Sequence, residues 1–181
     1  MIYVMLAEGF EEIEGLAFVD ILRRANIDVQ TVSVADNERV KGAHGIEIVA
    51  DTVISKVDKN IMEAIVFPGG LPGAYNLRDS ENIEKLTKYA YDKGDIIIGA
   101  ICASPCVVLY NYGLLDGRKA TVYPGFEEEM TKAVMCDEDV VRDGMIITSK
   151  GPGTTHKFAK TFVEIFADKE TAEKIICGMV Y

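Results

Sequence analysis

The sequence has no long hydrophobic run and no cluster of basic residues. None of its apolar segments approaches the roughly 20 residues that a membrane-spanning helix needs. The amino-terminal stretch MIYVMLAEGFEEIEG has no basic region, and Glu8 ends its short apolar run, so we expect no secretory signal. Lys and Arg number 19 against 29 Asp and Glu, a formal net charge of -10. This acidity argues against binding to nucleic acid or to an anionic membrane surface.

Cysteine and histidine are also scarce. The cysteines show no C-x-x-C spacing, and the two histidines are too few to complete a zinc framework. These residues are Cys102, Cys106, Cys136, Cys177, His44 and His156. The sequence therefore predicts no metal site. We expect the thiols to stay free in a reducing cytoplasm, where disulfides rarely persist.

The chain is 181 residues long and 49% hydrophobic, which suits a single domain over 1–181. Strand-like and helix-like segments alternate along it. Apolar, β-branched runs that are typical of strands occur at 2–7, 28–35, 64–70 and 95–101, with a further candidate at 119–125. Periodic apolar faces predict helices at 11–27, 80–94, 104–115, 154–168 and 169–181. Residues 38–57 are interpreted as a hairpin or irregular excursion, and Asp143-Gly144 predicts a hairpin over 140–151.

This alternation predicts a three-layer α/β/α sandwich around a mostly parallel sheet. In such folds ligands bind outside the carboxyl ends of the strands. Four segments fall at those ends, namely Glu8-Gly9, Pro68-Gly69-Gly70, Cys102 and Gly151-Pro152-Gly153. Their convergence at one edge of the sheet is the first indication of a functional site.

Cys102 lies between the apolar run IIIGAI and a helix-like run that begins with ASP. A residue at such a junction sits on a sharp turn, as in the nucleophile elbow of hydrolases. The helix N-terminus favours a thiolate, and the N–H groups of Ala103 and of Gly69-Gly70 could face an oxyanion. A free cysteine is, however, often only a small buried hydrophobe. Position alone leaves both interpretations open.

The motifs GAICASP, VFPGGLPGAYNLRDS, AEGFEEIE and TSKGPGT, taken together and in this order, closely resemble the ThiJ/PfpI superfamily. The nearest branch is the parkinsonism-associated deglycase group. The resemblance implies a flavodoxin-like sandwich, in that branch usually a homodimer, with a reactive cysteine at Cys102. It also implies that Glu14 is a buried, protonated partner of the sulfur. Without the resemblance, Glu11, Glu12 and Glu14 would be interpreted as a solvated first helical turn.

The sequence departs from the family pattern at three positions. Tyr123 stands where deglycase-type members often carry a histidine, and a phenol does not act as a general base near neutral pH. Ala103 stands where peptidase-like members place a histidine, so a Cys-His protease mechanism lacks its base. His44 aligns with an arginine that approaches the pocket from the partner chain in some relatives. It could bind an anionic group, although a role in capping a loop is the simpler interpretation.

Other residues near these motifs have two interpretations each. Asp20 matches a pocket-side aspartate in the family, or it pairs with Arg23 or Arg24. Gly151 and Pro152 belong to a segment that could hold a substrate carboxylate with backbone N–H groups or could be a structural turn. His156 is interpreted as an ordinary helical residue, and Cys106 as core packing, with a resolving-thiol role as the alternative.

The resemblance implies a cofactor-independent enzyme that acts on small dicarbonyls such as methylglyoxal, or on their early adducts with proteins. In that mechanism Cys102 attacks the aldehyde carbon, Gly70 and Ala103 stabilise the oxyanion, and Glu14 moves the proton. The alternative is an oxidative-stress sensor whose Cys102 is oxidised by peroxide to the sulfinate.

Overall fold

The computed structural model describes all of residues 1–181, and a mostly parallel sheet lies at its centre. Its strands are β1 (Ile2–Leu6), β2 (Val29–Ser33), β5 (Thr52–Val53), β6 (Ala64–Phe67), β7 (Ile97–Ile101), β10 (Val140–Asp143) and β11 (Ile146–Ser149). They form one seven-stranded sheet in the order β10-β11-β7-β6-β1-β2-β5. Every pair is parallel except β10 with β11, which form the antiparallel hairpin expected at Asp143-Gly144.

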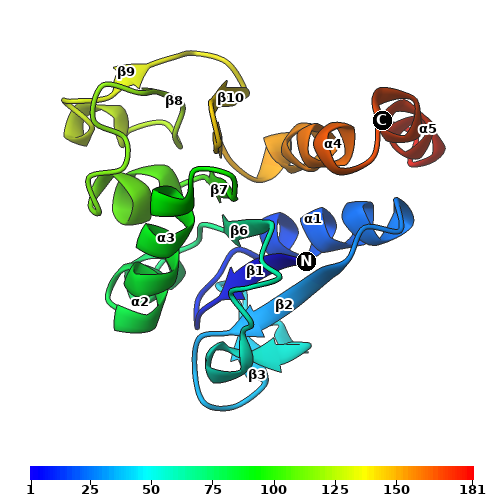
Figure 1. The fold of residues 1–181 in the computed structure, drawn as a ribbon, viewed down its shortest axis with the longest axis horizontal. Coiled ribbons are helices and arrows are strands. Elements are labelled where there is room, and N and C mark those ends of the chain that lie inside the picture. The colour runs from blue at the N-terminus through cyan, green and yellow to red at the C-terminus, as the bar shows by residue number, and fades with distance from the viewer.

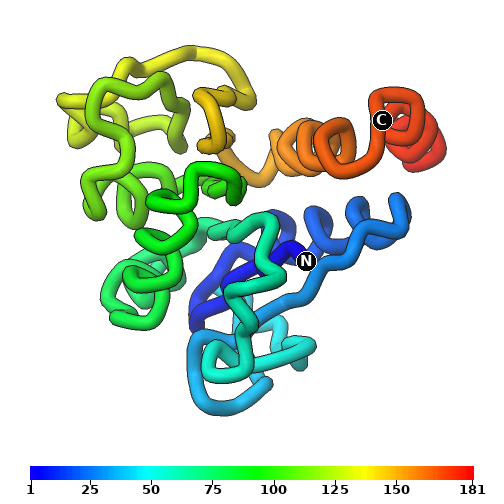
Figure 2. Tube along the Cα trace, viewed as in Figure 1, coloured from blue at the N-terminus to red at the C-terminus, as the bar shows by residue number.

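Helices cover both faces of this sheet, as Figures 1 and 2 show. One face carries α1 (Glu12–Arg24), α4 (Thr155–Phe166) and α5 (Lys169–Gly178). The other carries α2 (Gly73–Arg78), α3 (Glu81–Lys93) and the π-helix η2 (Pro105–Tyr110). The predicted α/β/α sandwich is confirmed, and no helix of the structure is long and apolar enough to cross a membrane.

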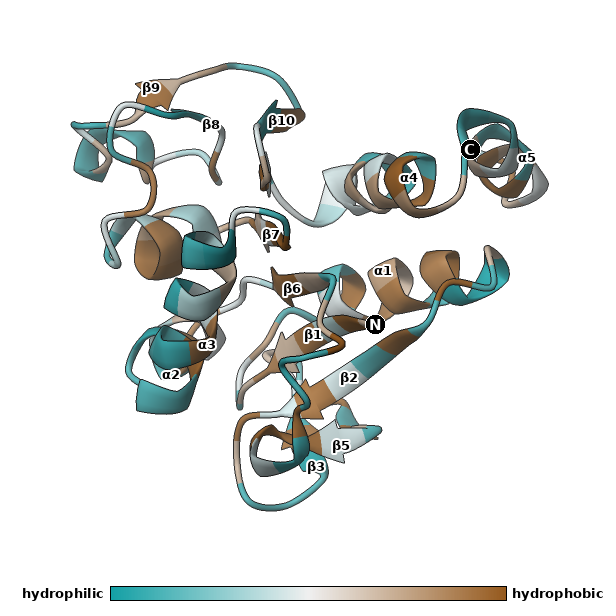
Figure 3. Cartoon of the chain, viewed as in Figure 1, coloured by the Kyte–Doolittle hydropathy of each residue, from teal (hydrophilic) through white to brown (hydrophobic).

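Alternation along the strands builds a separate core on each face. Tyr3 and Met5 of β1 pack with Leu77 and Ile83 on the α2–α3 side. Ile2, Val4 and Leu6 pack with aromatic residues of α1 and α4 on the other, where Phe18 and Phe162 meet edge to face at 5.0 Å. Both faces are therefore apolar, which is why the strands appear in the sequence as continuous hydrophobic runs. In Figure 3 the central strands β1 and β6 are largely brown, whereas α2 and α3 carry much teal.

Smaller elements surround the sheet. The excursion after β2 contains the antiparallel hairpin β3 (Arg39–Lys41) and β4 (Glu47–Val49). A parallel pair, β8 (Lys119–Ala120) and β9 (Val134–Met135), stands apart from the main sheet. Three short 3₁₀ segments complete the structure, namely η1 (Ile54–Lys56), η3 (Glu127–Glu129) and η4 (Pro152–Thr154).

The structure corrects three local predictions. The strand expected at 119–125 is only two residues long, because Pro124 has no N–H to donate and the Thr121 N–H instead bonds the Thr148 side chain at 2.9 Å. The helix expected at 104–115 is a short π-type segment followed by turns, with i→i+5 bonds such as Asn111 N to Cys106 O. Helix α2 was not predicted, because its Pro72-Gly73 start is typical of a turn.

The strand order places a cleft at the expected edge. The chain runs from β1 outward to β2 and then returns to β6 on the opposite side of β1. Such a reversal separates the connections after β1 and β6 and opens a crevice at their carboxyl ends. The segments that follow β1, β6 and β7 all meet there, and they carry Glu14, Gly69 and Cys102 respectively.

Candidate active site

Cys102 occupies a strained turn directly after β7. Its φ is +64°, in the left-handed region that non-glycine residues seldom adopt. Its N–H still continues the sheet by donating to Ser149 O at 2.9 Å, while its carbonyl accepts from the Tyr123 N–H at 2.9 Å. Two backbone bonds thus hold this residue in a conformation that costs free energy. Backbone strain of this kind is typical of a functional position.

Ser104 fastens the turn to its neighbour. Its buried hydroxyl donates to the Pro68 carbonyl at 2.6 Å and so joins the loop after β7 to the loop after β6. The sequence analysis did not single out this residue. Its position in GAICASP, two residues after the elbow, was the only available signal.

Glu14 lies in the first turn of α1 and is 1% exposed. The side chain of Glu11 caps this helix by accepting from the Glu14 N–H at 2.8 Å, which orients the turn. Glu14 Oε2 accepts a hydrogen bond from the Gly69 N–H at 2.7 Å, and its Oε1 has no hydrogen-bond partner within the chain. Burial raises the pKa of Glu14 to about 7, because the ionised carboxylate is poorly solvated there.

The Cys102 thiol and the Glu14 carboxyl affect each other's ionisation. Burial and the Glu14 carboxylate raise the pKa of the Cys102 thiol to about 12, whereas N–H groups of Gly70 and Ala103 lower it. The helix N-terminus predicted a thiolate, but desolvation and the neighbouring carboxylate act in the opposite direction. Protonating Glu14 removes the opposing negative charge. The arrangement therefore couples ionisation of the thiol to protonation of Glu14.

Two glycines bring the loop after β6 against this pair. A Cβ on Gly69 would lie 2.6 Å from Cys102 Cβ and 3.0 Å from Glu14 Oε2. Gly70 has φ +84°, and a Cβ there would lie 2.5 Å from the Glu11 nitrogen. Because neither position tolerates a side chain, the backbone itself forms the wall beside the sulfur. The backbone N–H groups of Gly70 and Ala103 lie on the side of the sulfur and lower the pKa of the Cys102 thiol.

A cavity of about 420 Å³ opens onto Cys102. It brings together Cys102, Gly70, Ala103, His44, Tyr123 and Pro152, all of which the sequence analysis named. Apolar side chains of Ile13, Leu71 and Phe126 complete the wall, and these the sequence analysis missed. Leu71 and Phe126 lie in turns, which have no periodic pattern, and Ile13 is an exposed residue in the first turn of α1.

The remaining candidates lie elsewhere or act as structural contacts. Asp20 forms an ion pair with Arg24 at 2.7 Å and does not line the cavity. A Cβ on Gly151 would lie 3.1 Å from the Tyr123 ring, and the Gly151 N–H donates to Thr154 Oγ1 at 3.1 Å, so the GPGT segment is a tight turn. His156 stacks on Tyr181 with ring centroids 4.2 Å apart.

The Cys106 sulfur points toward Glu129, 3.9 Å away, and packs in the core on the opposite face from Cys102.

Glu11 and Glu12 are not a solvated helical turn. They are 7% and 5% exposed, and Glu12 Oε1 accepts from the His44 N–H at 2.7 Å. The His44 ring, in contrast, is exposed, and its Nδ1 lies 2.7 Å from Glu12 Oε2. The start of α1 and the β3–β4 hairpin are therefore joined through these side chains.

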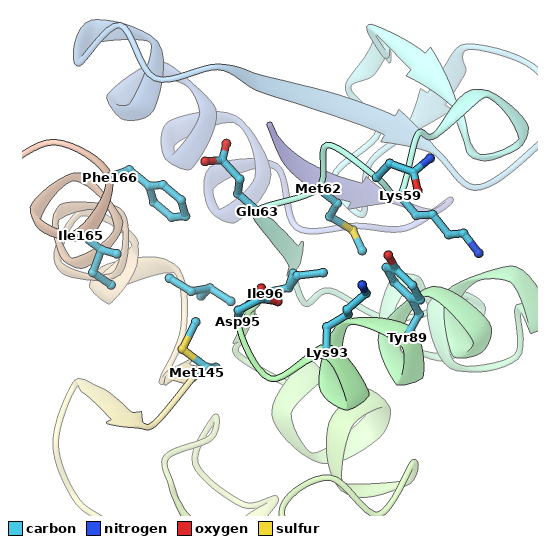
Figure 4. Close-up of a pocket in the computed structure, with 12 residues that line it drawn as sticks. Lys59, Met62, Glu63, Tyr89, Lys93, Asp95, Ile96, Met145, Ile165 and Phe166 are labelled. Carbon is cyan, nitrogen blue, oxygen red and sulfur yellow. The ribbon is translucent and has the colours of Figure 1, made fainter.

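A second cavity, of about 330 Å³, lies at the opposite edge of the sheet beside the amino ends of β6, β7 and β11. Figure 4 shows Lys59 and Lys93 on either side of the Tyr89 ring, with Phe166 and Met145 across the hollow. The ammonium groups of Lys59 and Lys93 lie 4.9 and 5.6 Å from the centroid of the Tyr89 ring. No cysteine or histidine lines this cavity, whereas Cys102 and His44 line the cavity at the carboxyl edge.

Comparisons with known proteins agree with this geometry. Protein DJ-1 homolog A of Arabidopsis thaliana is 39% identical over 176 residues, which cover 96% of this chain and 45% of that protein. Glutathione-independent glyoxalase DJR-1.2 of Caenorhabditis elegans is 34% identical over 171 residues, covering 93% of this chain and 89% of the relative. The solved structure of oxidized Toxoplasma gondii DJ-1 superposes with a TM-score of 0.92 at 38% identity, covering 99% of this chain and 97% of that chain.

The chain spans less than half of the length of the two Arabidopsis relatives, DJ-1 homologs A and B, of which it covers 45% and 40%. Against the shorter relatives the match extends over almost the whole of both chains. Residues 1–165 match the DJ-1/PfpI family. The elbow cysteine, the buried glutamate and the sheet order all lie within that range, and the chain belongs to the DJ-1/PfpI family.

Proposed function

We propose that this protein is a cofactor-independent glyoxalase-type enzyme, which converts a small dicarbonyl such as methylglyoxal to a hydroxy acid. One observation carries the proposal. The buried Glu14 carboxyl, with its pKa raised to about 7, faces a cysteine held at φ +64° on a strand-to-helix turn. An acid–base group that titrates near neutral pH beside a nucleophile suits proton transfers during carbonyl chemistry.

The first step is addition of sulfur to the aldehyde. Glu14 carboxylate takes the thiol proton, and the Cys102 sulfur forms a bond to the aldehyde carbon. The alkoxide that results faces the N–H groups of Gly70 and Ala103 and receives the proton from Glu14. The product of this step is a hemithioacetal, and Glu14 is again ionised.

The second step moves hydrogen between adjacent carbons. Glu14 removes the proton from the former aldehyde carbon and returns it to the former ketone carbon, while the hydroxyl proton of the first carbon passes to the ketone oxygen. The first carbon is thereby oxidised to a thioester, and the second is reduced to an alcohol. Water then cleaves the thioester, which releases the hydroxy acid and restores the thiol. Because oxidation and reduction occur within one molecule, no external oxidant is consumed.

The test is consumption of methylglyoxal and formation of lactate in the absence of glutathione. We expect turnover by the wild type and none by Cys102→Ala. Cys106→Ala is the matched control, because it removes a thiol only four residues away that packs in the other core. Turnover that survives in Cys102→Ala, or no turnover in the wild type, would contradict the proposal. Early methylglyoxal adducts of a peptide amine serve as the second substrate to assay.

A second candidate function is an oxidative-stress sensor. A solved relative at 38% identity is named as oxidized DJ-1 from Toxoplasma gondii. In this chain, a protonated Glu14 could donate a hydrogen bond to a Cys102 sulfinate, which would stabilise that state. Mild peroxide should then add two oxygens at Cys102 ahead of Cys106, Cys136 and Cys177, as intact mass and peptide mapping would report. Equal oxidation of all four thiols would remove this candidate. Either function suits a reducing cytoplasm, in which the cysteines start as free thiols.

We further propose that the protein forms a homodimer beside this site. Ile13, Ile46 and Val49 are 55%, 54% and 61% exposed, and they belong to the joined start of α1 and the β3–β4 hairpin. An apolar surface of this kind is typical of an interface. Light scattering should show a dimer for the wild type and a monomer for Val49→Lys. A monomeric wild type at micromolar concentration would exclude the interface.

A further inference from the structure

Three ligand-type side chains from two distant parts of the chain converge at the mouth of the Cys102 cavity. Glu11 and Glu12 come from the start of α1, and His44 comes from the loop of the β3–β4 hairpin. One ligand atom from each, two carboxylate oxygens and an imidazole nitrogen, lies within 4.8 Å of the others. The sequence predicted no metal site, because the glutamates and the histidine are more than 30 residues apart and match no ligand spacing.

Each carboxylate is anchored by one oxygen and presents the other. Glu11 Oε2 accepts from the Glu14 N–H at 2.8 Å, while Glu11 Oε1 accepts no hydrogen bond and lies 3.9 Å from His44 Nδ1. Glu12 Oε1 accepts from the N–H groups of His44 and Ile46, while Glu12 Oε2 lies 2.7 Å from the same Nδ1. Second-shell anchoring of this kind orients a metal ligand.

The burial and charge of the group favour a cation. The Glu11 and Glu12 side chains are 10% and 6% exposed, and neither forms an ion pair with a lysine or an arginine. Gly42 packs directly on the Glu12 carboxylate, since a Cβ there would lie 2.3 Å from Oε1. Two carboxylates held this close repel each other unless a positive charge lies between them. His44 supplies at most one such charge, and its ring is 70% exposed.

We propose that Glu11, Glu12 and His44 form a binding site for a divalent transition-metal cation, of which Zn²⁺ is the representative. Ligand atoms about 2.1 Å from a tetrahedral zinc are roughly 3.4 Å apart. His44 Nδ1 lies 2.7 Å from Glu12 Oε2 and 3.9 Å from Glu11 Oε1, one distance shorter and one longer than this value. Small side-chain rotations therefore suffice to bring the three atoms to the separations that zinc requires. Two carboxylates and one imidazole leave a fourth position for water or a small ligand, as in open zinc sites.

The fourth position would face the cavity, because Glu11 and His44 both line it together with Cys102. A small anion or carbonyl oxygen in the cavity could therefore bind the cation there. An arginine at position 44, which the family resemblance places there in some relatives, would supply a fixed positive charge and exclude a metal ion. The proposed metal site therefore requires the histidine that this chain carries at position 44. It does not depend on the reaction proposed at Cys102.

Calorimetric titration of the purified protein with zinc chloride tests this proposal, using the protein in its own oligomeric state. We expect one Zn²⁺ per chain, and at least a tenfold weaker Kd in both His44→Gln and Glu11→Gln. His156→Gln is the matched control, since it removes the other histidine, and Cys102→Ala tests whether the thiol is the ligand instead. Both should bind as the wild type does. Circular dichroism confirms that each variant is folded.

Cobalt(II) provides an independent readout of the ligands. Tetrahedral binding by two carboxylates and an imidazole should produce visible ligand-field bands without the near-ultraviolet band of a thiolate ligand. Zinc affinity unchanged in His44→Gln, or lost only in Cys102→Ala with a thiolate band for cobalt, would overturn the proposal. An interaction that is equally weak in all variants would show only nonspecific surface binding and would overturn it as well.

Discussion

Glu14 Oε2 accepts a 2.7 Å hydrogen bond from the backbone N–H of Gly69, 55 residues away in the sequence. This contact turns the carboxyl of an otherwise ordinary helical turn toward Cys102. The other oxygen of this carboxyl, Oε1, is buried and has no hydrogen-bond partner in the chain. Packing of α1 against the loop after β6 therefore buries this carboxyl, and the burial raises its pKa to about 7.

Replacing Glu14 tests that role. Glu14→Gln keeps the size of the side chain but cannot exchange a proton, so we expect kcat/KM for methylglyoxal to fall roughly 100-fold or more. Glu14→Asp keeps the acid on a shorter arm and should retain more activity than Glu14→Gln. Steady-state kinetics with matched circular dichroism spectra measure this. Equal activity of Glu14→Gln and the wild type would show that the carboxyl moves no proton.

The pH dependence of stability should follow Glu14. Its ordinary pKa is 4.5 and the folded protein raises it to about 7, so the folded state binds the proton more tightly than the unfolded state. The free energy of unfolding should therefore fall as pH rises from about 4.5 to about 7, by about 3 kcal/mol from this group alone. Urea unfolding at several pH values measures it.

Glu14→Gln is the reference for this measurement. Its amide does not titrate, so the difference between wild type and variant isolates the carboxyl from all other groups. The difference should change steadily between pH 5 and pH 7 and become constant above that range. A difference that does not vary with pH would mean that Glu14 has the same proton affinity in the folded and unfolded chains.

Gly69 should not tolerate a side chain, because it packs directly against Cys102 and Glu14. In Gly69→Ala the new Cβ would lie 2.6 Å from Cys102 Cβ, so the loop must move away from both Cys102 and Glu14. We expect activity to fall at least tenfold and the midpoint of thermal unfolding to fall by several degrees. Gly153→Ala is the matched control, because its Cβ would have no neighbour within 4 Å. Similar effects of both substitutions would rule out this steric explanation.

Ser104 should contribute to both stability and activity. Ser104→Ala leaves the buried Pro68 carbonyl without its hydroxyl donor, at a cost of about 1–3 kcal/mol. It also loosens the link between the two loops, so kcat should fall even under conditions where the variant is fully folded. Thr87→Ala is the control: its buried hydroxyl donates at 2.7 Å to Ile83, whose carbonyl also accepts a helical N–H. Thr87→Ala should destabilise the protein less than Ser104→Ala does, and its activity should equal that of the wild type.

Much of the fold could be predicted from the sequence, because each main strand is a short apolar run and each long helix has a periodic face. Strands β1, β2, β6 and β7 and the β10–β11 hairpin occur where they were expected. The prediction was wrong at 119–125 and incomplete at 104–115. In both places, hydrogen bonds to other segments replace the regular pattern: Thr121 bonds a side chain of β11, and η2 adopts i→i+5 bonding.

By itself, the sequence determined the order of elements and the position of Cys102 at a strand-to-helix junction, because both depend on local patterns of apolar residues and turns. Only the tertiary structure decided which side chains meet Cys102. Glu14 is buried against Gly69, Asp20 remains outside, and Glu11, Glu12 and His44 come together across two elements. Distances and desolvation depend on how strands and helices pack, and no local pattern in the chain encodes them. The chemistry of this site therefore follows from packing at the carboxyl edge of the sheet.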